Sequence, residues 1–257
     1  AKKLKVIVTA TTGLNHIDLE TADSYGVKVL SLKGERDFLD TLTATAELTW
    51  SLLLALYRNL PAAIKHVKNE RWDRDLFKGS QLKGKTLGII GYGRLGSIVA
   101  EYAKVFKMNI VVTDPFVDNV PIGIQKVSLS ELLQRSDIVS LHVNYDQSTH
   151  RMLGSNEFQK IKIGAVFINT SRSELVDEEA MLKAFDEKKL AGIAIDVLHG
   201  EAEKNQDWLK NSMVWKKSLT NNNIIIVPHI GGATYESMED TEIFMAKKLK
   251  KYINSDL

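Results

Sequence analysis

Three glycines at a fixed spacing are the residues of this sequence that point most directly to chemistry. They belong to the motif GYGRLG at residues 91–96, which follows the apolar run TLGII and precedes a helical pattern. In that context the first glycine allows a tight turn, the second lets the backbone approach a pyrophosphate, and the third lets helix and strand pack closely. Amides at the start of the helix then donate to phosphate oxygens. The motif predicts a dinucleotide-binding loop made of Gly91, Gly93, Arg94, Leu95 and Gly96.

A carboxylate stands where such a loop requires one. The next apolar run, NIVVT, ends immediately before Asp114, eighteen residues after Gly96. An acid at that place accepts hydrogen bonds from the ribose hydroxyls of the adenosine half. It would also repel a 2′-phosphate, so the expected cofactor is NAD rather than NADP.

Short apolar runs, rich in β-branched residues, alternate with helical patterns along the chain and would position these groups. Strands that are apolar throughout and separated by helices are typical of a parallel sheet covered on both faces. We therefore predict an α/β fold with a Rossmann doubly wound parallel sheet. The predicted strands are KVIVTA, VKVLSL, TLGII, NIVVT, DIVSLHV, AVFINT, AGIAID and NIIIVPH.

The stretch WDRDLFKGSQLKGK interrupts the apolar periodicity with charges and glycines and predicts a domain boundary. It divides the chain into a cofactor domain over 77–235 and a partial substrate-binding domain over 1–76, which the C-terminal helix 236–257 completes. A long helix is predicted over 43–67. Only two strand–helix units precede that helix, too few for a sheet domain that buries both faces, so the chain begins as if in mid-fold.

The composition excludes several classes of protein. Lysine plus arginine (34) nearly balance aspartate plus glutamate (32), so nothing draws the chain to nucleic acid or to an anionic membrane. The absence of cysteine excludes disulfides and thiol catalysis and suits a reducing cytoplasm. The longest apolar run, LTWSLLLALY, is too short to span a bilayer. We expect a soluble, cytoplasmic protein without a metal site.

Four motifs together resemble those of the D-isomer-specific 2-hydroxyacid dehydrogenases. They are GYGRLG, FINTSRSELVDEEAM, AGIAIDVLHGE and IIIVPHIGGAT, in the order that the family has them. The resemblance runs from TTGLNHID to the last helix and is strongest to the phosphoglycerate dehydrogenase branch. It implies an oxidoreductase that transfers a hydride between NAD(H) and a D-2-hydroxy acid or 2-oxo acid. It also implies that the second, incomplete α/β domain is flavodoxin-like.

The resemblance implies a catalytic group of three side chains. Arg172 would bind the substrate carboxylate and polarise its carbonyl, for which a fork of donors suits better than a lysine. His229 would be the acid/base, and Glu201 would raise its pKa and fix its tautomer. Reduction of a 2-oxo acid takes a hydride at C2 and a proton at the carbonyl oxygen, which a protonated histidine can donate. Glu203 in the same loop remains a rival for the role of Glu201.

Further contacts follow from the same resemblance. Asp196 would lie near the nicotinamide, with Thr170 and Gly231 as additional cofactor contacts. The backbone around Thr12 and Gly13 would receive the substrate carboxylate. Ser173 stands where relatives usually have glycine. The other histidines are interpreted as surface or capping residues: His16, His66, His142, His150 and His199.

Several alternatives stay open. Phosphoglycerate, glycerate, hydroxypyruvate, glyoxylate and lactate are all possible substrates, with 3-phosphoglycerate leading by family prevalence alone. A homodimer is expected through the long helix 43–67. The chain could instead be an NADH-sensing binding protein, or a catalytically impaired paralogue or fragment. At ~30 residues or more per βαβ unit, we expect a natural chain longer by on the order of 60–80 residues before the first strand.

Overall fold

The computed structural model describes residues 3–14, 16–201 and 207–255. Contacts divide the chain into two compact units, a larger one over residues 45–231 and a smaller one formed by residues 1–44 and 232–257. All the cofactor residues and all three catalytic residues that the sequence predicts lie in the larger unit. The loop expected to receive the substrate carboxylate lies in the smaller one.

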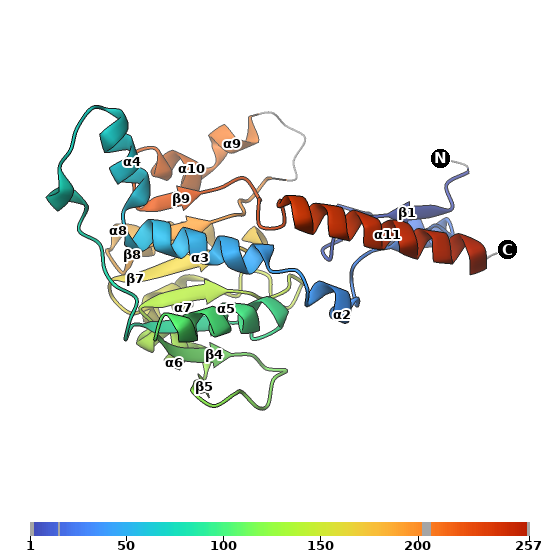
Figure 1. The fold of residues 1–257 in the computed structure, drawn as a ribbon, viewed down its shortest axis with the longest axis horizontal. Coiled ribbons are helices and arrows are strands. Elements are labelled where there is room, and N and C mark those ends of the chain that lie inside the picture. Colours follow the sequence, from blue (N-terminus) through green and yellow to red (C-terminus); the bar gives the residue numbers. More distant parts are fainter. Residues whose placement is uncertain (1–2, 15, 202–206, 256–257) are drawn as a thin grey trace. The chain divides into compact units, whose positions relative to one another are not determined.

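A seven-stranded parallel sheet forms the larger unit (Figure 1). Its strand order is β5-β4-β3-β6-β7-β8-β9. Strands β4 and β5 thus lie on one side of β3, and the later strands β6 to β9 lie on the other. This is the order of a doubly wound Rossmann sheet, which changes direction between β3 and β6. The prediction of a Rossmann α/β fold is confirmed. The strands are β3 (Thr86–Ile90), β4 (Asn109–Thr113), β5 (Ile124–Lys126), β6 (Ile138–Leu141), β7 (Ala165–Asn169), β8 (Leu190–Ile195) and β9 (Ile224–Ile226).

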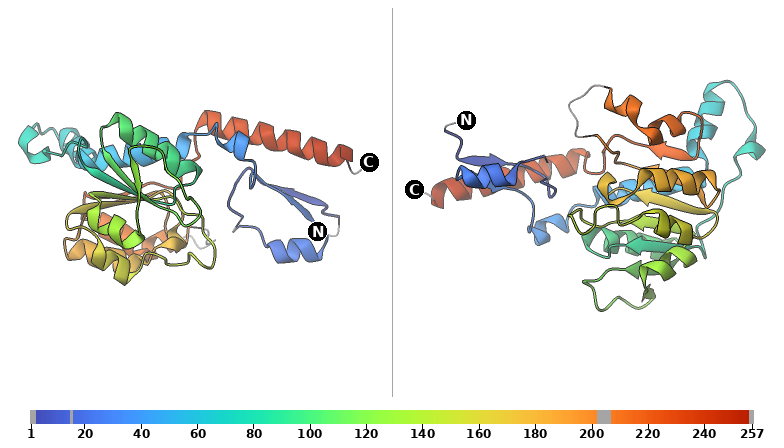
Figure 2. Two further views of the ribbon diagram at one scale, coloured as in Figure 1. Left: turned by 90° about the horizontal axis from the view of Figure 1, so that it is seen from below. Right: turned by 180° about the vertical axis from the view of Figure 1, so that it is seen from behind.

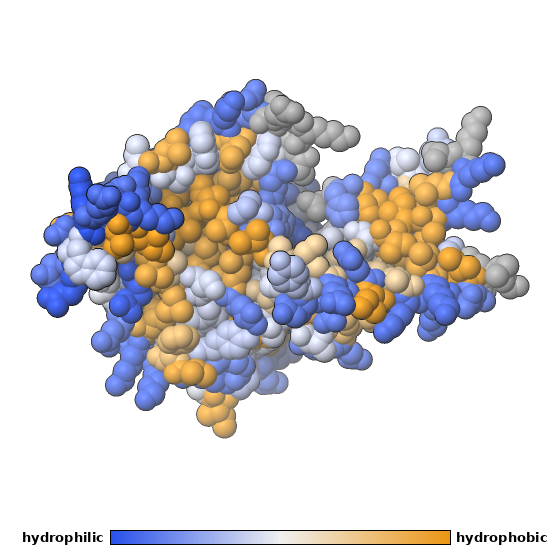
Figure 3. Space-filling view, turned by 45° about the horizontal axis from the view of Figure 1, so that its top comes forward, coloured by the Kyte–Doolittle hydropathy of each residue, from blue (hydrophilic) through white to orange (hydrophobic). Residues whose placement is uncertain are grey.

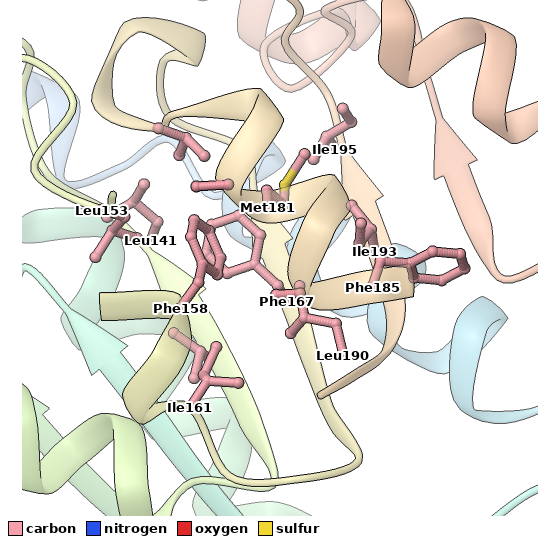
Figure 4. Packing of buried hydrophobic residues seen from close by; sticks show 14 of the residues in the cluster. Leu141, Leu153, Phe158, Ile161, Phe167, Met181, Phe185, Leu190, Ile193 and Ile195 are labelled. Carbon is pink, nitrogen blue, oxygen red and sulfur yellow. The ribbon is translucent and has the colours of Figure 1, made fainter. Parts of the chain in front are cut away.

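Both faces of this sheet are covered, because its strands are apolar on both sides. In β7, Phe167 points to one face while Val166 and Ile168 point to the other. Helices α6, α7, α8 and α10 cover the first face, and α3 and α5 cover the second (Figure 2). The core on the first face includes the edge-to-face pair of Phe158 and Phe167, with ring centroids 5.7 Å apart (Figure 4). The helices of this unit after β3 are α5 (Arg94–Val105), α6 (Leu129–Arg135), α7 (Ser155–Lys160), the 3-10 turn η2 (Ser173–Leu175), α8 (Glu178–Asp186), α9 (Trp208–Asn211) and α10 (Met213–Ser218).

Helix α3 (Ala44–Tyr57) packs on the sheet of the larger unit. Its buried Leu53 and Leu56 belong to the core of the second face, and a Cβ on Gly192 of β8 would lie 2.9 Å from Leu56. The boundaries expected at residues 76–77 and 235–236 therefore differ from the observed divisions at 44–45 and 231–232. The physical reason is that the apolar face of α3 packs into the core formed by the sheet and α5, which follow it in sequence.

The single helix expected over residues 43–67 is instead two helices. Helix α3 ends at Tyr57, and α4 (Leu60–Lys68) begins after Asn59, whose φ of 52° is left-handed. Pro61 lies in the first turn of α4, where its missing N–H is not needed. The 3-10 turn η1 (Arg74–Phe77) follows before the chain enters the sheet.

The smaller unit contains two parallel strands and a long helix. Strands β1 (Val6–Val8) and β2 (Lys28–Leu30) pair in register, and α11 (Tyr235–Ser255) packs beside them (Figure 1). Leu30, Leu32 and Met245 are its buried core. Its shorter helices are α1 (Leu19–Ser24) and α2 (Arg36–Leu39). Within the described ranges, no helix of either unit combines the length and apolarity that crossing a bilayer requires.

Candidate active site

The predicted site residues of the larger unit follow the carboxyl ends of its strands. Because all seven strands are parallel, these ends share one edge of the sheet, which is where open α/β sheets bind ligands. The glycine motif follows β3 and Asp114 follows β4 on one side of the switch point. On the other side lie the residues after β7, β8 and β9, which are Thr170, Arg172, Asp196, Glu201, His229 and Gly231.

The glycine motif makes a tight turn between β3 and α5. Gly91 has a φ of +89°, which L side chains rarely adopt. A Cβ on Gly96 would lie 2.1 Å from the carbonyl oxygen of Gly91, so this position requires glycine for the helix to approach the strand. A Cβ on Gly93 would meet nothing within 4 Å, so this side of the loop is open. The loop therefore fits a pyrophosphate, whose close approach needs a backbone without side chains.

Asp114 is fixed beside this loop by two backbone amides. Its Oδ2 accepts a hydrogen bond from the amide of Tyr92 at 2.8 Å, and its Oδ1 accepts one from Phe116 at 2.8 Å. Each carboxylate oxygen has a second lone pair. The carboxylate is thus held at the end of β4 with acceptor capacity left for ribose hydroxyls, which fits the adenosine half of a dinucleotide.

His229 and Glu201 form a hydrogen-bonded pair. Nδ1 of His229 lies 2.9 Å from Oε1 of Glu201, and because a carboxylate only accepts, Nδ1 carries the proton. This hydrogen bond raises the pKa of His229, and the charge of Glu201 acts in the same direction, against burial and the nearby charge of Arg172. The rival Glu203 lies outside the described residues. The pairing leaves Nε2 of His229 as the nitrogen that can release or take up a proton.

Asp196 holds the turn that presents His229. Its Oδ1 accepts the amide of Ile230 at 2.7 Å and its Oδ2 that of Gly231 at 2.8 Å, while its carbonyl oxygen accepts the amide of His229 at 2.9 Å. His229 has a φ of 51°, a left-handed conformation that is uncommon for residues other than glycine. Burial raises the pKa of Asp196. The acid expected near the nicotinamide is thus also the clamp of the histidine turn.

Arg172 follows a turn that Asn169 fixes at the end of β7. The side chain of Asn169 donates to the carbonyl oxygen of Arg172 at 2.9 Å and accepts the amide of Ser171 at 2.9 Å. One guanidinium nitrogen of Arg172 donates to the carbonyl of Ser171 at 2.7 Å. The charge of Arg172 lowers the pKa of His229, so the structure brings these two groups near each other.

Thr170 and Gly231 are packed against α3. The hydroxyl of buried Thr170 lies 2.8 Å from that of Thr49, and the hydroxyl of Thr45 donates to the carbonyl of Gly231 at 3.0 Å. A Cβ on Gly231 would come within 2.9 Å of Asp196.

In the smaller unit the loop of Thr12 and Gly13 is exposed or half-buried, and the hydroxyl of Thr11 donates to the carbonyl of Gly13 at 2.8 Å.

Sequence reasoning missed one histidine at the same edge. His142 follows β6 and is half-buried, and burial of its ring lowers its pKa to about 4, which does not fit its interpretation as a surface or capping residue. Its Nε2 lies 2.8 Å from the hydroxyl of Ser140, and its Nδ1 has no hydrogen-bond partner within the part of the chain that the structure describes. The signal was its place directly after the buried run DIVSL.

Comparison with known proteins agrees with this geometry. Residues 50–231 match the model of the D-isomer specific 2-hydroxyacid dehydrogenase, NAD binding domain. The chain is 35% identical to D-3-phosphoglycerate dehydrogenase from Methanocaldococcus jannaschii over 261 residues, all of this chain and 47% of that protein. It is 35% identical to glyoxylate reductase from Thermococcus litoralis over 269 residues, all of this chain and 76% of that protein. It thus spans about half the length of the first and three quarters of the second.

The fold gives the same result. The structure superimposes on D-lactate dehydrogenase from Aquifex aeolicus, solved with NAD and lactic acid, with a TM-score of 0.85. The two chains are 30% identical, and the match covers 99% of this chain and 78% of the other. Because the family model covers most of the chain, the chain belongs to the D-isomer specific 2-hydroxyacid dehydrogenase family, and residues 50–231 are its NAD-binding domain.

Proposed function

We propose that this chain transfers a hydride between NAD(H) and a D-2-hydroxy acid or 2-oxo acid, with His229 as the acid/base. The observation that carries the proposal is the 2.9 Å hydrogen bond between His229 and Glu201 at the ligand-binding edge of an NAD-binding domain. Bound NADH supplies the hydride. The chain's own residues then have to hold the substrate and move one proton.

The proton step follows from the pairing. In the reducing direction, protonated His229 donates from Nε2 to the carbonyl oxygen while Nδ1–H stays bonded to Glu201. Glu201 stabilises the imidazolium before the transfer and keeps the ring oriented after it. In the oxidising direction the neutral ring takes the hydroxyl proton at the same nitrogen.

Arg172 is the proposed anchor of the substrate carboxylate. A guanidinium offers five N–H donors in a planar fork, and one nitrogen of Arg172 is used on its own turn. The remaining donors suit a carboxylate adjacent to a carbonyl. We further propose that backbone amides of the loop of Thr12 and Gly13 bind substrate. Thr170, Asp196 and Gly231 are proposed to line the nicotinamide side.

The substrate is proposed only as a class. Relatives that are equally similar to this chain are named for 3-phosphoglycerate and for glyoxylate, so identity alone does not choose between them. What those names share is a carboxylate next to the carbon that is oxidised or reduced. We keep 3-phosphoglycerate as the first substrate to test, through its oxidised form 3-phosphohydroxypyruvate.

The proposed cofactor preference is for NADH over NADPH. Asp114 is held at the strand end by two amides, and its charge would meet a 2′-phosphate at close range. We expect NADPH to bind more weakly than NADH. The substitution Asp114→Ser should reduce the difference between the two dissociation constants. Fluorescence titration with both nucleotides measures this, and equal affinities in the unchanged chain would contradict the role of Asp114.

The test of activity is NADH oxidation with a panel of 2-oxo acids that includes 3-phosphohydroxypyruvate, hydroxypyruvate, glyoxylate and pyruvate. We expect turnover with at least one of them. His229→Ala should lower kcat by roughly 10²–10⁴ while the Kd for NADH stays nearly unchanged. NADH binding without turnover of any panel member would contradict a dehydrogenase. A His229→Ala variant within a few-fold of the parent would contradict the acid/base assignment.

We also propose that the chain forms a homodimer through α4 and η1. The apolar run LLLALY does not supply this surface, because Leu52, Leu53 and Leu56 are buried within the chain itself. Apolar side chains instead reach the surface of the larger unit (Figure 3). On α4 and on the segment around η1 the exposed ones are Leu60, Ile64, Val67, Trp72 and Leu76. A second copy of the chain would cover them.

A further inference from the structure

The loop that carries Glu201 is held at one point by a carboxylate from another element. After β8 the chain passes through buried Val197 and Leu198 and then through His199 and Gly200 to Glu201. The amide of His199 donates to Oε1 of Glu178 at 3.1 Å. Glu178 is the first residue of α8 and is 21 positions away in sequence. This bond is therefore a tertiary anchor, in contrast to the local bond between the amide of Glu201 and the carbonyl of Leu198.

The ring of His199 strengthens the same attachment. Its Nε2 lies 3.3 Å from the carbonyl oxygen of Val176, two residues before Glu178. The amide and the ring of one residue thus both bind the segment that starts α8. Only one residue, Gly200 with a φ of +85°, separates this anchor from Glu201. A displacement of His199 would consequently be passed on to the carboxylate that His229 needs.

Glu178 also borders the turn of Arg172. A small cavity at this place is lined by the polar Asn169 and Ser173, by Glu178 and by the apolar Val176, Met181, Ile195 and Val197. Asn169 is the residue that fixes the Arg172 turn. The Glu178 carboxylate therefore lies next to both the loop that leads to Glu201 and the turn that carries Arg172. Burying a carboxylate is unfavourable unless it is hydrogen-bonded, so its presence here calls for a specific partner, and the amide of His199 is that partner.

We propose that Glu178 is a positioning residue: its bond to the His199 amide sets the loop 197–201 and thereby the hydrogen bond between Glu201 and His229. The inference deepens the proposed function, on which it rests for its meaning in catalysis. It requires only the acceptor oxygen of Glu178, not its charge. Burial raises the pKa of Glu178, which fits this, because a carbonyl-type oxygen accepts from the amide in either protonation state.

The charged groups around Glu178 and around His229 determine the pKa values that a titration of these two residues would measure. Around Glu178 they are Asp177, whose charge raises the pKa of Glu178, and His199, whose charge lowers it. Around His229 they are Glu201 and Asp196, which raise its pKa, and Arg172, which lowers it. Glu178 is not one of these charged groups, so we attribute an effect of Glu178 on the His229 pKa to a change in the position of Glu201.

The test compares Glu178→Ala, Glu178→Asp and Glu178→Gln with Glu179→Ala, a matched control at the exposed neighbouring position of the same helix turn. Alanine removes the acceptor, and aspartate withdraws it by one methylene while keeping the charge. Glutamine keeps an acceptor oxygen at full reach without the charge. The first readout is the pKa of His229 from an NMR titration of its ring protons, assigned with His229→Ala. The second is kcat and its pH profile with the best substrate of the panel.

We expect the pKa of His229 to fall in the alanine and aspartate variants, and kcat to fall on the order of tenfold with little change in the KM for NADH. Glutamine should restore both quantities, and the Glu179 control should leave them unchanged. If the alanine variant does not fold, the aspartate and glutamine variants decide. A role based on the charge of Glu178 predicts that aspartate keeps the His229 pKa and kcat and that glutamine lowers them, which is the opposite of our expectation. An unchanged His229 pKa in the folded alanine or aspartate variant would overturn the proposal. The NMR readout needs no turnover, so failure of the proposed dehydrogenase activity is distinguished from failure of this inference.

Discussion

At the scale of single residues, the site depends on a histidine in an unusual conformation. His229 has a left-handed φ, and a non-glycine residue in that region costs on the order of 1–3 kcal/mol unless its surroundings determine it. Asp196 supplies that determination through three hydrogen bonds to the turn. The resemblance places Asp196 beside the cofactor, but only the structure shows what its two oxygens bind.

The first prediction concerns Asp196→Asn. The amide keeps one acceptor oxygen but turns an NH₂ group toward a backbone amide, so one of two bonds is replaced by a donor–donor conflict. We expect a loss of about 1–3 kcal/mol in the free energy of unfolding and a lower kcat. Urea unfolding and steady-state kinetics measure these. An unchanged stability would mean that the turn is held by other contacts.

The second prediction is a pH dependence. The hydrogen bond to Glu201 raises the pKa of His229 above its ordinary value of 6.5. Reduction needs the protonated ring, so kcat/KM for a 2-oxo acid should fall as the pH rises through that raised pKa, and oxidation should rise over the same range. Glu201→Gln should move both midpoints to lower pH. Stopped-flow rates between pH 5 and 9 measure the shift, and coincident profiles for parent and variant would contradict the pairing.

At the scale of elements, each loop of the site is set by how closely a helix or strand can approach. Gly96 lets α5 begin against the end of β3, whereas Gly93 leaves the loop open outward. The two glycines of one motif therefore differ physically: Gly96 is required for packing, and we propose that the open side at Gly93 is where the cofactor binds. A matched pair of substitutions separates them.

The third prediction compares Gly96→Ala with Gly93→Ala. The first forces a Cβ to within 2.1 Å of a backbone oxygen, so overpacking should lower stability by about 1–3 kcal/mol or more. The second meets no atom within 4 Å and should leave the melting temperature nearly unchanged while weakening NADH binding. Thermal unfolding and nucleotide titration check the pair. A loss of stability in Gly93→Ala as large as in Gly96→Ala would contradict this division of tasks.

The elements also show what sequence could predict. The eight strand runs and the glycine motif are local patterns, so the sheet, its fold class and the cofactor edge followed from them. Asn59 is a residue type that readily adopts a left-handed φ and Pro61 follows it closely, but the apolar periodicity of residues 43–67 outweighed these two local signs, so the break between α3 and α4 was missed. The burial of His142 and the packing of α3 on β8 depend on residues far apart in sequence. For the same reason the expected domain boundary lay about thirty residues too late.

The partners of the site residues divide in the same way. Arg172, Glu201 and His229 could be predicted as site residues because each lies in or next to a motif of consecutive residues. The hydrogen bonds between Asp196 and Ile230 and between Glu178 and His199 join segments that are far apart in sequence, and no spacing in the sequence encodes them. Side chains that support a site are less visible in a sequence than those that act in it.

At the scale of the whole molecule, the apolar side chains on α4 and around η1 are exposed in the part of the chain that the structure describes. The fourth prediction is that the chain of 28.8 kDa sediments at twice that mass, and that Ile64→Glu shifts it toward the single-chain mass. Ile64 is 54% exposed, so the charge should not disturb the fold of one chain. Analytical ultracentrifugation over a range of concentrations measures the shift, with the exposed Lys65→Glu on the same helix as control. A single-chain mass for the parent protein at all concentrations would contradict the dimer.

The pairing of Thr49 with Thr170 has a consequence for how the chain is made. These two hydroxyls lie 121 residues apart in sequence, and Leu56 likewise contacts a later part of the chain, at Gly192 of β8. At about 5–20 residues per second, a ribosome needs on the order of ten seconds to supply those strands after α3 has emerged. During that interval the leucines of α3 face water. The newly made segment then resembles the targets of chaperones that bind unfolded apolar chains. Its leucines become buried only when the last strands of the sheet have been synthesised.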